Sequence, residues 1–291
     1  MLSGFAVRRI DVEGSSVAVA VAGTGPPLLL LHGYPQTRAC WHRVAPALAE
    51  RFTVVAADLR GYGDSAKPPG GVGHVDYSKR EMARDLVGAM AALGFARFAV
   101  AGHDRGGRVA HRMALDHPEV VERAAVLDIV PTRTLFASSD QAFATAYYHW
   151  FFLIQPDGLP ETLIGHDPEW FLRETLRRWS GRAESIAEEA IREYARCFRD
   201  PACIHASCED YRAAASIDLE HDAADQGAVI ACPLLVLWGE QGAMHRLYDV
   251  LGAWRPLAAD VRGRALPCGH FLPEESPEET TQALRDFFAP V

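Results

Sequence analysis

The stretch RFAVAGHDRGGRVAHRMALD, residues 97–116, decides the fold. It begins as an apolar run, passes through a glycine-rich turn around Asp104, and continues with a helical pattern. A sharp strand-to-helix turn needs small residues two positions before and two positions after its tip, and Gly102 and Gly106 occupy those positions. The stretch therefore predicts a buried strand, a tight turn with Asp104 exposed at its tip, and a helix.

Short apolar runs alternate with helical patterns along the chain, which is typical of an α/β protein with a mostly parallel sheet and helices on both faces. We predict eight strands, at 5–12, 17–21, 28–31, 53–58, 97–101, 124–129, 234–238 and 264–266. The first two alternate apolar with polar or small residues and should form an antiparallel edge, whereas the others are nearly all apolar, as doubly covered parallel strands tend to be. Helices are predicted at 41–50, 78–93, 106–116, 244–253 and 278–288.

The alternation of strands and helices breaks after Pro131. Residues 132–225 have a helical pattern rich in aromatic and charged residues, and strand signals resume only at Pro233. We therefore expect a core domain formed by 1–131 and 226–291, with a helical cap domain of 132–225 inserted between two strands.

Composition restricts the class of protein. The 291 residues are 49% hydrophobic and 23% charged, with a net charge of −9, which is typical of a soluble globular protein and not of a disordered chain or a coiled coil. The acidic balance and the lack of a basic run argue against nucleic-acid or anionic-membrane binding. The six cysteines form no C-x-x-C pair, and no apolar run reaches the ~20 residues that a membrane span needs. We expect a cytoplasmic protein without a signal peptide.

Asp104 is the candidate nucleophile. A carboxylate with an ordinary pKa of about 3.9 is already anionic at neutral pH, so it can attack an sp³ carbon without a base. The alternative is that Asp104 merely caps the following helix, which is a common use of Asp.

Attack by a carboxylate leaves an ester whose hydrolysis requires an activated water. His270 follows the last predicted strand, which is where an architecture with such a strand-to-helix turn places its catalytic His. Two acids could orient it, and we favour Asp128 over Glu240 because an acid inside an apolar run is costly to bury without a partner. The backbone N–H groups of Tyr34 and Arg105 are the expected oxyanion donors.

These residues lie in motifs that resemble the α/β-hydrolase superfamily, and more closely the haloacetate (fluoroacetate) dehalogenases. The resemblance covers essentially the whole chain, and GHDRGGR, LDIVPT and the YHW of YHWFFL are its most specific parts. The motifs are HGYPQ (32–36), DLRGYGDS (58–65), GHDRGGR (102–108), LDIVPT (127–132), YHWFFL (148–153) and GHFLPEE (269–275).

The resemblance implies a hydrolase that converts a short 2-haloacid, such as fluoroacetate or chloroacetate, to the 2-hydroxyacid and halide. Asp104 would be the nucleophile, Asp128 the acid and His270 the base. The remaining site residues would be Arg105 and Arg108 for the substrate carboxylate, and His149, Trp150 and Tyr211 for the halide. A homodimer is implied as well, with the haloacid and water as small-molecule partners.

The two arginines also make physical sense as an anion site. Arg105 and Arg108 lie three positions apart in the first helical turn, where the helix dipole disfavours cations by up to about 1 kcal/mol each. An anion should compensate them, and forked guanidinium groups suit a substrate carboxylate. The alternative is an exposed arginine pair on a solvated helix.

Two rival functions remain open. An epoxide hydrolase has a similar layout but activates the ring oxygen with cap tyrosines, for which Tyr147, Tyr148 and Tyr211 are candidates. A neutral epoxide, however, offers the arginine pair nothing to bind. A hydrolase-fold binding protein without turnover is the second rival, which the set of Asp, His and Asp argues against.

We expect no cofactor and no metal. The chain contains neither G-x-G-x-x-G nor a phosphate-binding loop, and the hydrolytic mechanism needs neither. The spacing of Cys203, His205 and Cys208, with Cys197 upstream, does not match that of a zinc site.

Overall fold

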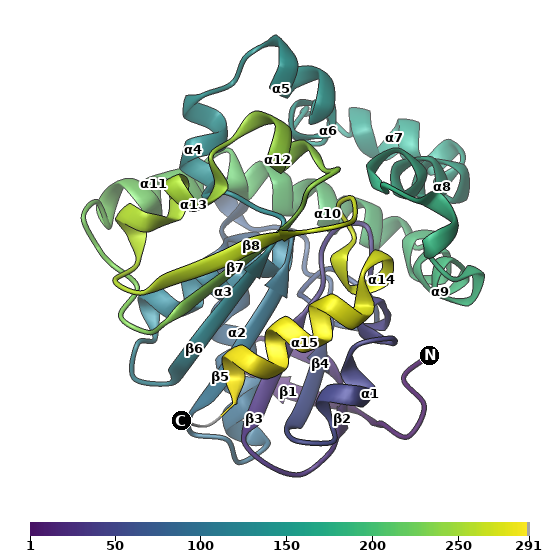
Figure 1. Cartoon of the computed structure of the whole chain (residues 1–291). Helices are drawn as coiled ribbons and strands as arrows, with labels where there is room; N and C mark the ends of the chain where they lie inside the picture. The colour runs from purple at the N-terminus through teal and green to yellow at the C-terminus, as the bar shows by residue number, and fades with distance from the viewer. Residues whose placement is uncertain (290–291) are drawn as a thin grey trace.

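One eight-stranded sheet runs through the molecule in the order β1-β2-β4-β3-β5-β6-β7-β8 (Figure 1). The computed structural model describes residues 1–289. β2 pairs antiparallel with β1 and with β4, and all other neighbours are parallel. The strands are β1 Ala6–Val12, β2 Ser15–Ala22, β3 Pro27–Leu31, β4 Thr53–Ala57, β5 Phe98–His103, β6 Val121–Leu127, β7 Leu234–Gly239 and β8 Val261–Leu266.

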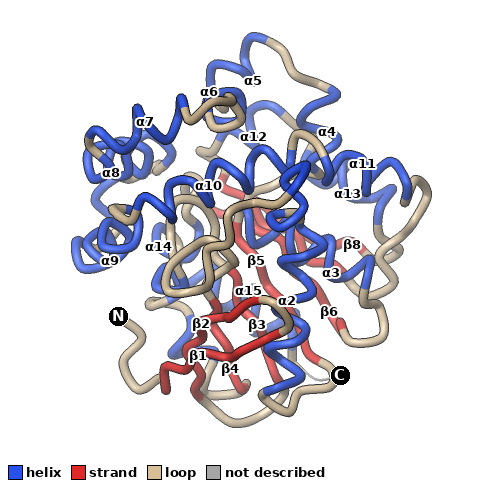
Figure 2. Tube along the Cα trace, turned by 180° about the vertical axis from the view of Figure 1, so that it is seen from behind, coloured by secondary structure: helices blue, strands red, loops and turns tan. Residues whose placement is uncertain are grey.

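All eight predicted strands are present, and the antiparallel edge is confirmed. β3 lies between β4 and β5 and is almost completely buried from Leu28 to Leu31, as expected for a strand covered on both faces. Helices α2 (Lys79–Ala92) and α3 (Arg105–Asp116) cover one face of the sheet, and α1 (Ala45–Leu48) and α15 (Pro277–Phe288) cover the other (Figures 1 and 2).

Two predicted helices are wrong in extent. The segment 41–50 begins at the last residue of a short 3₁₀ turn, η1 (Arg38–Trp41), and its only α-helix is the four residues of α1. The segment 244–253 is divided into α12 (Ala243–Leu247) and α13 (Val250–Trp254). The division has a local cause, because Asp249 is extended and its side chain accepts a hydrogen bond from the N–H of Gly252, which starts a new helix.

The chain between β6 and β7 forms helices that gather over one end of the sheet (Figure 1). The carboxyl ends of the parallel strands meet under these helices. The boundaries of the cap, 132–225, stay a prediction. The inserted helices are α4 Thr132–Ala137, α5 Gln141–Ala146, α6 Tyr148–Phe152, α7 Leu159–His166, α8 Pro168–Trp179, α9 Glu188–Phe198, α10 Pro201–Ala214 and α11 Ile217–Ala224, with the 3₁₀ turn η3 Ala183–Ser185.

The remaining short elements are the 3₁₀ turns η2 (Val72–Tyr77) and η4 (Arg255–Leu257) and the helix α14 (Leu272–Glu275). No helix within residues 1–289 is both long enough and apolar enough to cross a membrane.

Candidate active site

Asp104 occupies the tight turn between β5 and α3. Its backbone has φ 46° and ψ −114°, a strained conformation for a non-glycine residue. A Cβ on Gly102 would lie 2.1 Å from the carbonyl oxygen of Gly106, and one on Gly106 would lie 2.4 Å from that of His32. The turn therefore excludes larger residues at both positions, as expected from the sequence.

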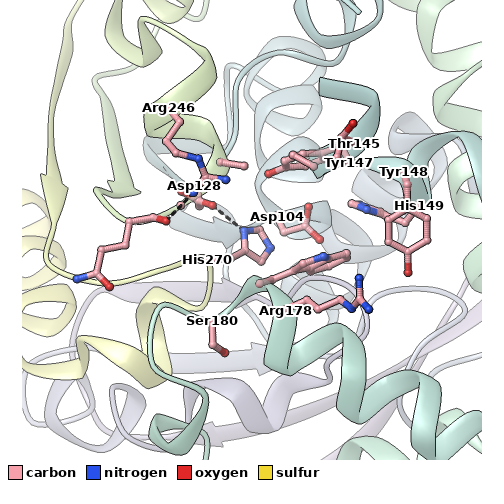
Figure 3. Close-up of a pocket in the computed structure, with 15 residues that line it drawn as sticks. Asp104, Asp128, Thr145, Tyr147, Tyr148, His149, Arg178, Ser180, Arg246 and His270 are labelled. Atoms are coloured by element: carbon pink, nitrogen blue, oxygen red, sulfur yellow. Dashed lines mark hydrogen bonds and ion pairs between the residues drawn. The ribbon is translucent and has the colours of Figure 1, made fainter. Parts of the chain in front are cut away.

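The side chain of Asp104 points into the site (Figure 3) and makes no capping hydrogen bond to α3. The helix-cap interpretation is therefore wrong. The expectation of an exposed tip is also wrong, because Asp104 is only 4% exposed. The cap helices that lie over this end of the sheet account for its burial.

His270 lies beside Asp104 and is held by Asp128 (Figure 3). Its Nδ1 is 2.6 Å from Oδ2 of Asp128, and the N–H of Gly239 donates to the other carboxylate oxygen at 3.0 Å. Asp128 follows β6 directly and is buried, whereas Glu240 is exposed. The structure thus brings His270 together with the acid that we favoured.

A second histidine, which the sequence analysis missed, supports the His270 loop. Nε2 of His103 lies 2.7 Å from the carbonyl oxygen of His270, and the N–H of His270 donates to the carbonyl of Trp179 at 3.1 Å. Burial lowers the pKa of His103 to about 3, so it is neutral and can donate through Nε2. The only signal in the sequence was its place next to Asp104.

The charges around the two central groups oppose the effect of burial. Burial alone would raise the pKa of Asp104, but the charges of His270 and of Arg105 hold that pKa below its usual value, so the carboxylate stays anionic. Burial alone would lower the pKa of His270, but its hydrogen bond to Asp128 and the charge of that carboxylate raise it.

One of the two predicted oxyanion donors contacts the carboxylate. The backbone N–H of Tyr34 donates to Oδ2 of Asp104 at 3.0 Å. The N–H of Arg105 belongs to the first residue of α3, directly after Asp104. Close approach is possible because residue 33 is glycine, where a Cβ would lie 2.5 Å from the Cβ of Asp104.

The two arginines, for which we expected a compensating anion, have different partners. Arg105 is fully buried and bonded by two nitrogens to the carboxylate of Asp210, through Nε at 2.9 Å and Nη2 at 2.7 Å. The anion that compensates Arg105 is therefore part of the protein. Sequence reasoning missed Asp210 because nothing local marks it as a partner of α3.

Arg108 is 4% exposed, and its side chain donates hydrogen bonds to neutral groups. Its Nη1 donates to the carbonyl of Val130 and to Oγ1 of Thr132, both at 3.0 Å. Burial and the charge of Arg105 lower the pKa of Arg108 to about 10, which leaves it cationic at neutral pH. A buried cation with neutral partners favours a bound anion.

The three residues predicted to bind halide are buried together. The ring of Tyr211 lies 5.7 Å from that of His149 and 5.6 Å from that of Trp150. Within residues 1–289, Nδ1 of His149, Nε1 of Trp150 and the hydroxyl of Tyr211 have no hydrogen-bond partner, and the same holds for Nη1 of Arg105 and Nε of Arg108. Burial keeps His149 neutral by lowering its pKa, and keeps the Tyr211 hydroxyl protonated by raising its pKa.

A cavity of about 390 Å³ leads to this cluster. Asp104, His149 and His270 line it, whereas Trp150 and Tyr211 are not part of its lining and are each 1% exposed. Its lining also contains residues that sequence reasoning did not assign to the site, among them Trp179 and Gln241. Arg178, Ser180 and Arg246 are further examples (Figure 3).

Tyr147 and Tyr148, the candidates for epoxide activation, also line the cavity. They differ in exposure, because Tyr147 is buried and Tyr148 is 40% exposed.

The described residues contain no cluster of three or more His, Cys, Asp or Glu side chains placed to hold a metal ion. Cys203 is buried in α10, and the ring of His205 contacts Glu161 through Nδ1 and the carbonyl of Pro69 through Nε2.

Comparison with known proteins agrees with the architecture. Fluoroacetate dehalogenase from Burkholderia sp. is 48% identical over 290 residues, covering 99% of this chain and 95% of that protein. Soluble epoxide hydrolase from Corynebacterium sp. (strain C12) is 37% identical over 288 residues, covering 96% of each. The crystal structure of an α/β hydrolase from Nostoc sp. PCC 7120 is 57% identical, with a TM-score of 0.99 and complete coverage of both chains.

A family model described as the alpha/beta hydrolase fold matches residues 26–277, which is most of the chain. The same residues carry the parallel sheet, the tight turn at Asp104 and the pair of His270 and Asp128. The chain therefore belongs to the α/β-hydrolase family.

Proposed function

We propose that the protein is a hydrolytic dehalogenase that converts a short 2-haloacid, such as fluoroacetate or chloroacetate, to the 2-hydroxyacid and halide. Its 48% identity to a fluoroacetate dehalogenase supports this proposal. For both of these substrates the organic product is glycolate.

The observation that carries the proposal is the set of unsatisfied donors beside the nucleophile. Among the described residues, His149, Trp150 and Tyr211 each present a buried polar atom without a partner. A buried donor left unpaired costs about 1–3 kcal/mol, so three in one place favour a ligand that accepts hydrogen bonds. A halide leaving without its water is such a ligand, and Arg108 offers a charge for the carboxylate of the same substrate.

In the first step, one oxygen of Asp104 attacks the carbon that bears the halogen. The N–H of Tyr34 engages Oδ2, so Oδ1 is the oxygen left for attack. A bond forms between Oδ1 and carbon while the carbon–halogen bond breaks, and its electron pair leaves with the halide. The negative charge moves from Asp104 to the halide, where the three donors can receive it.

In the second step, water hydrolyses the ester. Nδ1 of His270 is engaged by Asp128, so Nε2 takes a proton from water as the water oxygen bonds to the carboxyl carbon of Asp104. The resulting oxyanion sits on Oδ2, against the N–H of Tyr34. Its collapse breaks the bond from the carboxyl carbon to Oδ1, which leaves as the hydroxyl oxygen of the product with the proton that His270 took. The carboxyl group of Asp104 now contains the water oxygen and releases its remaining proton, which restores the carboxylate.

Halide release tests the function directly. Purified protein should release halide and form glycolate from fluoro-, chloro- or bromoacetate. Absence of release from all three would overturn the proposal.

The ester can be tested separately. His270→Ala removes the water-activating base but keeps the nucleophile, so intact-mass measurement after incubation with haloacetate should show an added carboxymethyl group. Digestion and peptide mass analysis should place that group on the peptide that contains Asp104. An unchanged mass in a folded variant that binds haloacetate counts against the mechanism.

Epoxide hydrolysis is the second candidate. The buried Tyr147 in the cavity wall and the 37% identity to a soluble epoxide hydrolase favour it. The buried charge of Arg108 opposes it, because a neutral epoxide offers that cation no anionic group to bind. Comparing diol formation from styrene oxide with halide release from chloroacetate separates the two. A protein that binds haloacetate but turns over neither substrate would instead be a binding protein.

A further inference from the structure

We propose that Asp210 is a positioning residue that holds Arg105 and Tyr211 in place and so determines how well the site releases a small, strongly hydrated halide. This inference rests on the proposed dehalogenase function. Asp210 lies in α10 immediately before Tyr211 and is completely buried.

The carboxylate of Asp210 accepts hydrogen bonds from three separate parts of the core. Arg105 of α3 donates through Nε to Oδ2 at 2.9 Å and through Nη2 to Oδ1 at 2.7 Å. The ammonium of Lys79 in α2 donates to Oδ1, and the hydroxyl of Tyr62 donates to Oδ2 at 2.7 Å. The backbone carbonyl of Asp210 accepts a further bond from Nη2 of Arg105 at 2.9 Å. Asp210, a residue of the inserted helices, is thus hydrogen-bonded to three different residues of the core.

These bonds fix what Arg105 can offer to a substrate. With Nε and Nη2 both engaged, Nη1 is the one nitrogen of its guanidinium that lacks a partner within residues 1–289. Its charge is balanced by Asp210, whereas Arg108 has neutral hydrogen-bond partners. Arg108 is therefore the principal ligand for the substrate carboxylate, and Arg105 contributes one donor.

The same bonds place Arg105 against two of the halide donors. Its guanidinium carbon lies 4.2 Å from the ring centroid of Tyr211 and 5.3 Å from that of Trp150, within range of cation–π contact. Asp210 also precedes Tyr211 in the same helix. Its hydrogen bonds therefore hold the backbone next to Tyr211 and also hold Arg105, whose guanidinium group lies against the Tyr211 ring. Displacing Asp210 should therefore disturb the halide donors Tyr211 and Trp150 both through the backbone of α10 and through Arg105.

A purely structural role for Asp210 makes a different prediction. If the residue only joined α10 to the core, its loss would reduce the amount of active enzyme, and turnover of every haloacetate would fall by one factor. A positioning role should instead change the ratio of fluoroacetate to bromoacetate turnover, since fluoride is the more strongly hydrated anion and depends more on well-placed donors.

The chain offers a matched control in Asp225. Its carboxylate also pairs with one residue of α2 and one of α3, Arg80 at 3.1 Å and Arg112 at 2.5 Å, but it lines a different cavity from the one that contains Asp104. Asp225→Asn therefore loosens another, more exposed connection of an inserted helix to the same two core helices without touching the donors.

The experiment measures saturating rates of halide release from fluoroacetate and bromoacetate, and both KM values, in native enzyme, Asp210→Asn and Asp225→Asn. We expect Asp210→Asn to lower the fluoroacetate rate at least about tenfold more than the bromoacetate rate, the scale of a lost charged hydrogen-bond arrangement. Asp225→Asn should leave the ratio within about twofold of native. If fluoroacetate is not turned over by native enzyme, chloroacetate replaces it.

An Asp210→Asn ratio equal to native would overturn the inference while leaving the dehalogenase function intact. Native enzyme that releases no halide from any haloacetate would overturn the function itself, and this inference with it. Should Asp210→Asn fail to fold, Tyr62→Phe removes one hydrogen bond to Oδ2 and should shift the ratio in the same direction by about two- to fivefold. An unshifted ratio in Tyr62→Phe would then overturn the inference.

Discussion

Nδ1 of His270 lies 2.6 Å from Oδ2 of Asp128, although the two residues are 142 positions apart in the chain. The backbone N–H of Gly239 donates a hydrogen bond to the other oxygen of the same carboxylate, so the side chain of Asp128 cannot rotate freely. With Nδ1 engaged, Nε2 is the nitrogen that remains to exchange protons. This single contact therefore orients the imidazole and raises its pKa against the effect of burial.

That balance predicts a pH dependence with a definite sign. Only the neutral imidazole can accept a proton, so ester hydrolysis should increase as pH rises through the pKa of His270, which lies above its usual value in the free enzyme. Asp128→Asn removes the opposing charge and leaves burial dominant, so the pKa should fall and the rising limb should move to lower pH. The rate on the plateau should still drop by at least about tenfold, because the imidazole loses its orienting acceptor.

The rate of ester hydrolysis in a single turnover, monitored by mass spectrometry at a series of pH values, measures this rise with pH in native and variant enzyme. A limb at the same pH in both would show that Asp128 does not control the protonation of His270.

Arg108 should be the stronger determinant of carboxylate recognition. Arg108→Leu removes the buried cation that has neutral partners, and it should reduce kcat/KM for haloacetate at least about tenfold, from a loss of about 1.5–3 kcal/mol. Haloacetamide, the uncharged counterpart, should be a poor substrate for native enzyme and little affected by the substitution. Equal activity of native enzyme on the acid and on its amide would contradict the assignment.

The tight turn at Asp104 makes a prediction about stability. A Cβ at Gly106 would lie 2.4 Å from the carbonyl oxygen of His32 and 2.7 Å from the Cβ of Leu31, and the backbone of β3 cannot readily move. Gly106→Ala should therefore lower the free energy of unfolding by about 1–3 kcal/mol or more. Gly88→Ala in α2 is the control, because its nearest contact, with Val12, is 3.4 Å away and alanine favours the helix by about 0.5–1 kcal/mol.

Urea unfolding of both glycine variants checks the contrast. Equal stability of the two would mean that the turn can relax around a methyl group.

The strands and the turn could be predicted because their signals are local. A run such as Leu28 to Leu31 is recognisable from its own residues, and the glycines around Asp104 report a backbone requirement at adjacent positions. Asp210 could not be predicted in the same way. Its partners Lys79, Arg105 and Tyr62 come from two helices and the loop after β4, and only tertiary packing brings their donors to one carboxylate.

The same reasoning explains why the different partners of the two arginines could not be predicted. The spacing of Arg105 and Arg108 places both in the first turn of α3, but it carries no information about which anion each one meets. The sequence of the turn likewise predicts an exposed tip, because it contains no information about the distant helices that bury Asp104.

Trp150 should act through its indole N–H. The side chain is 1% exposed, and within the part of the chain that the structure describes its Nε1 has no acceptor. Trp150→Phe removes that donor but keeps an aromatic body against Tyr211 and Arg108, whose guanidinium carbon lies 4.6 Å from the indole ring centroid. The substitution therefore separates hydrogen bonding from packing better than alanine would.

The expected effect depends on the halide. Fluoride is the smallest and most strongly hydrated of the halides, and its bond to carbon is the hardest to break, so its departure without the Trp150 donor is the least tolerable. Bromide leaves from a weaker bond and spreads its charge over a larger volume. Initial rates of halide release at saturating fluoroacetate and bromoacetate should thus fall unequally in Trp150→Phe, with the fluoroacetate rate reduced at least about fivefold more. If both rates fall by the same factor, Trp150 serves packing or substrate placement, and its assignment as a halide donor must be withdrawn.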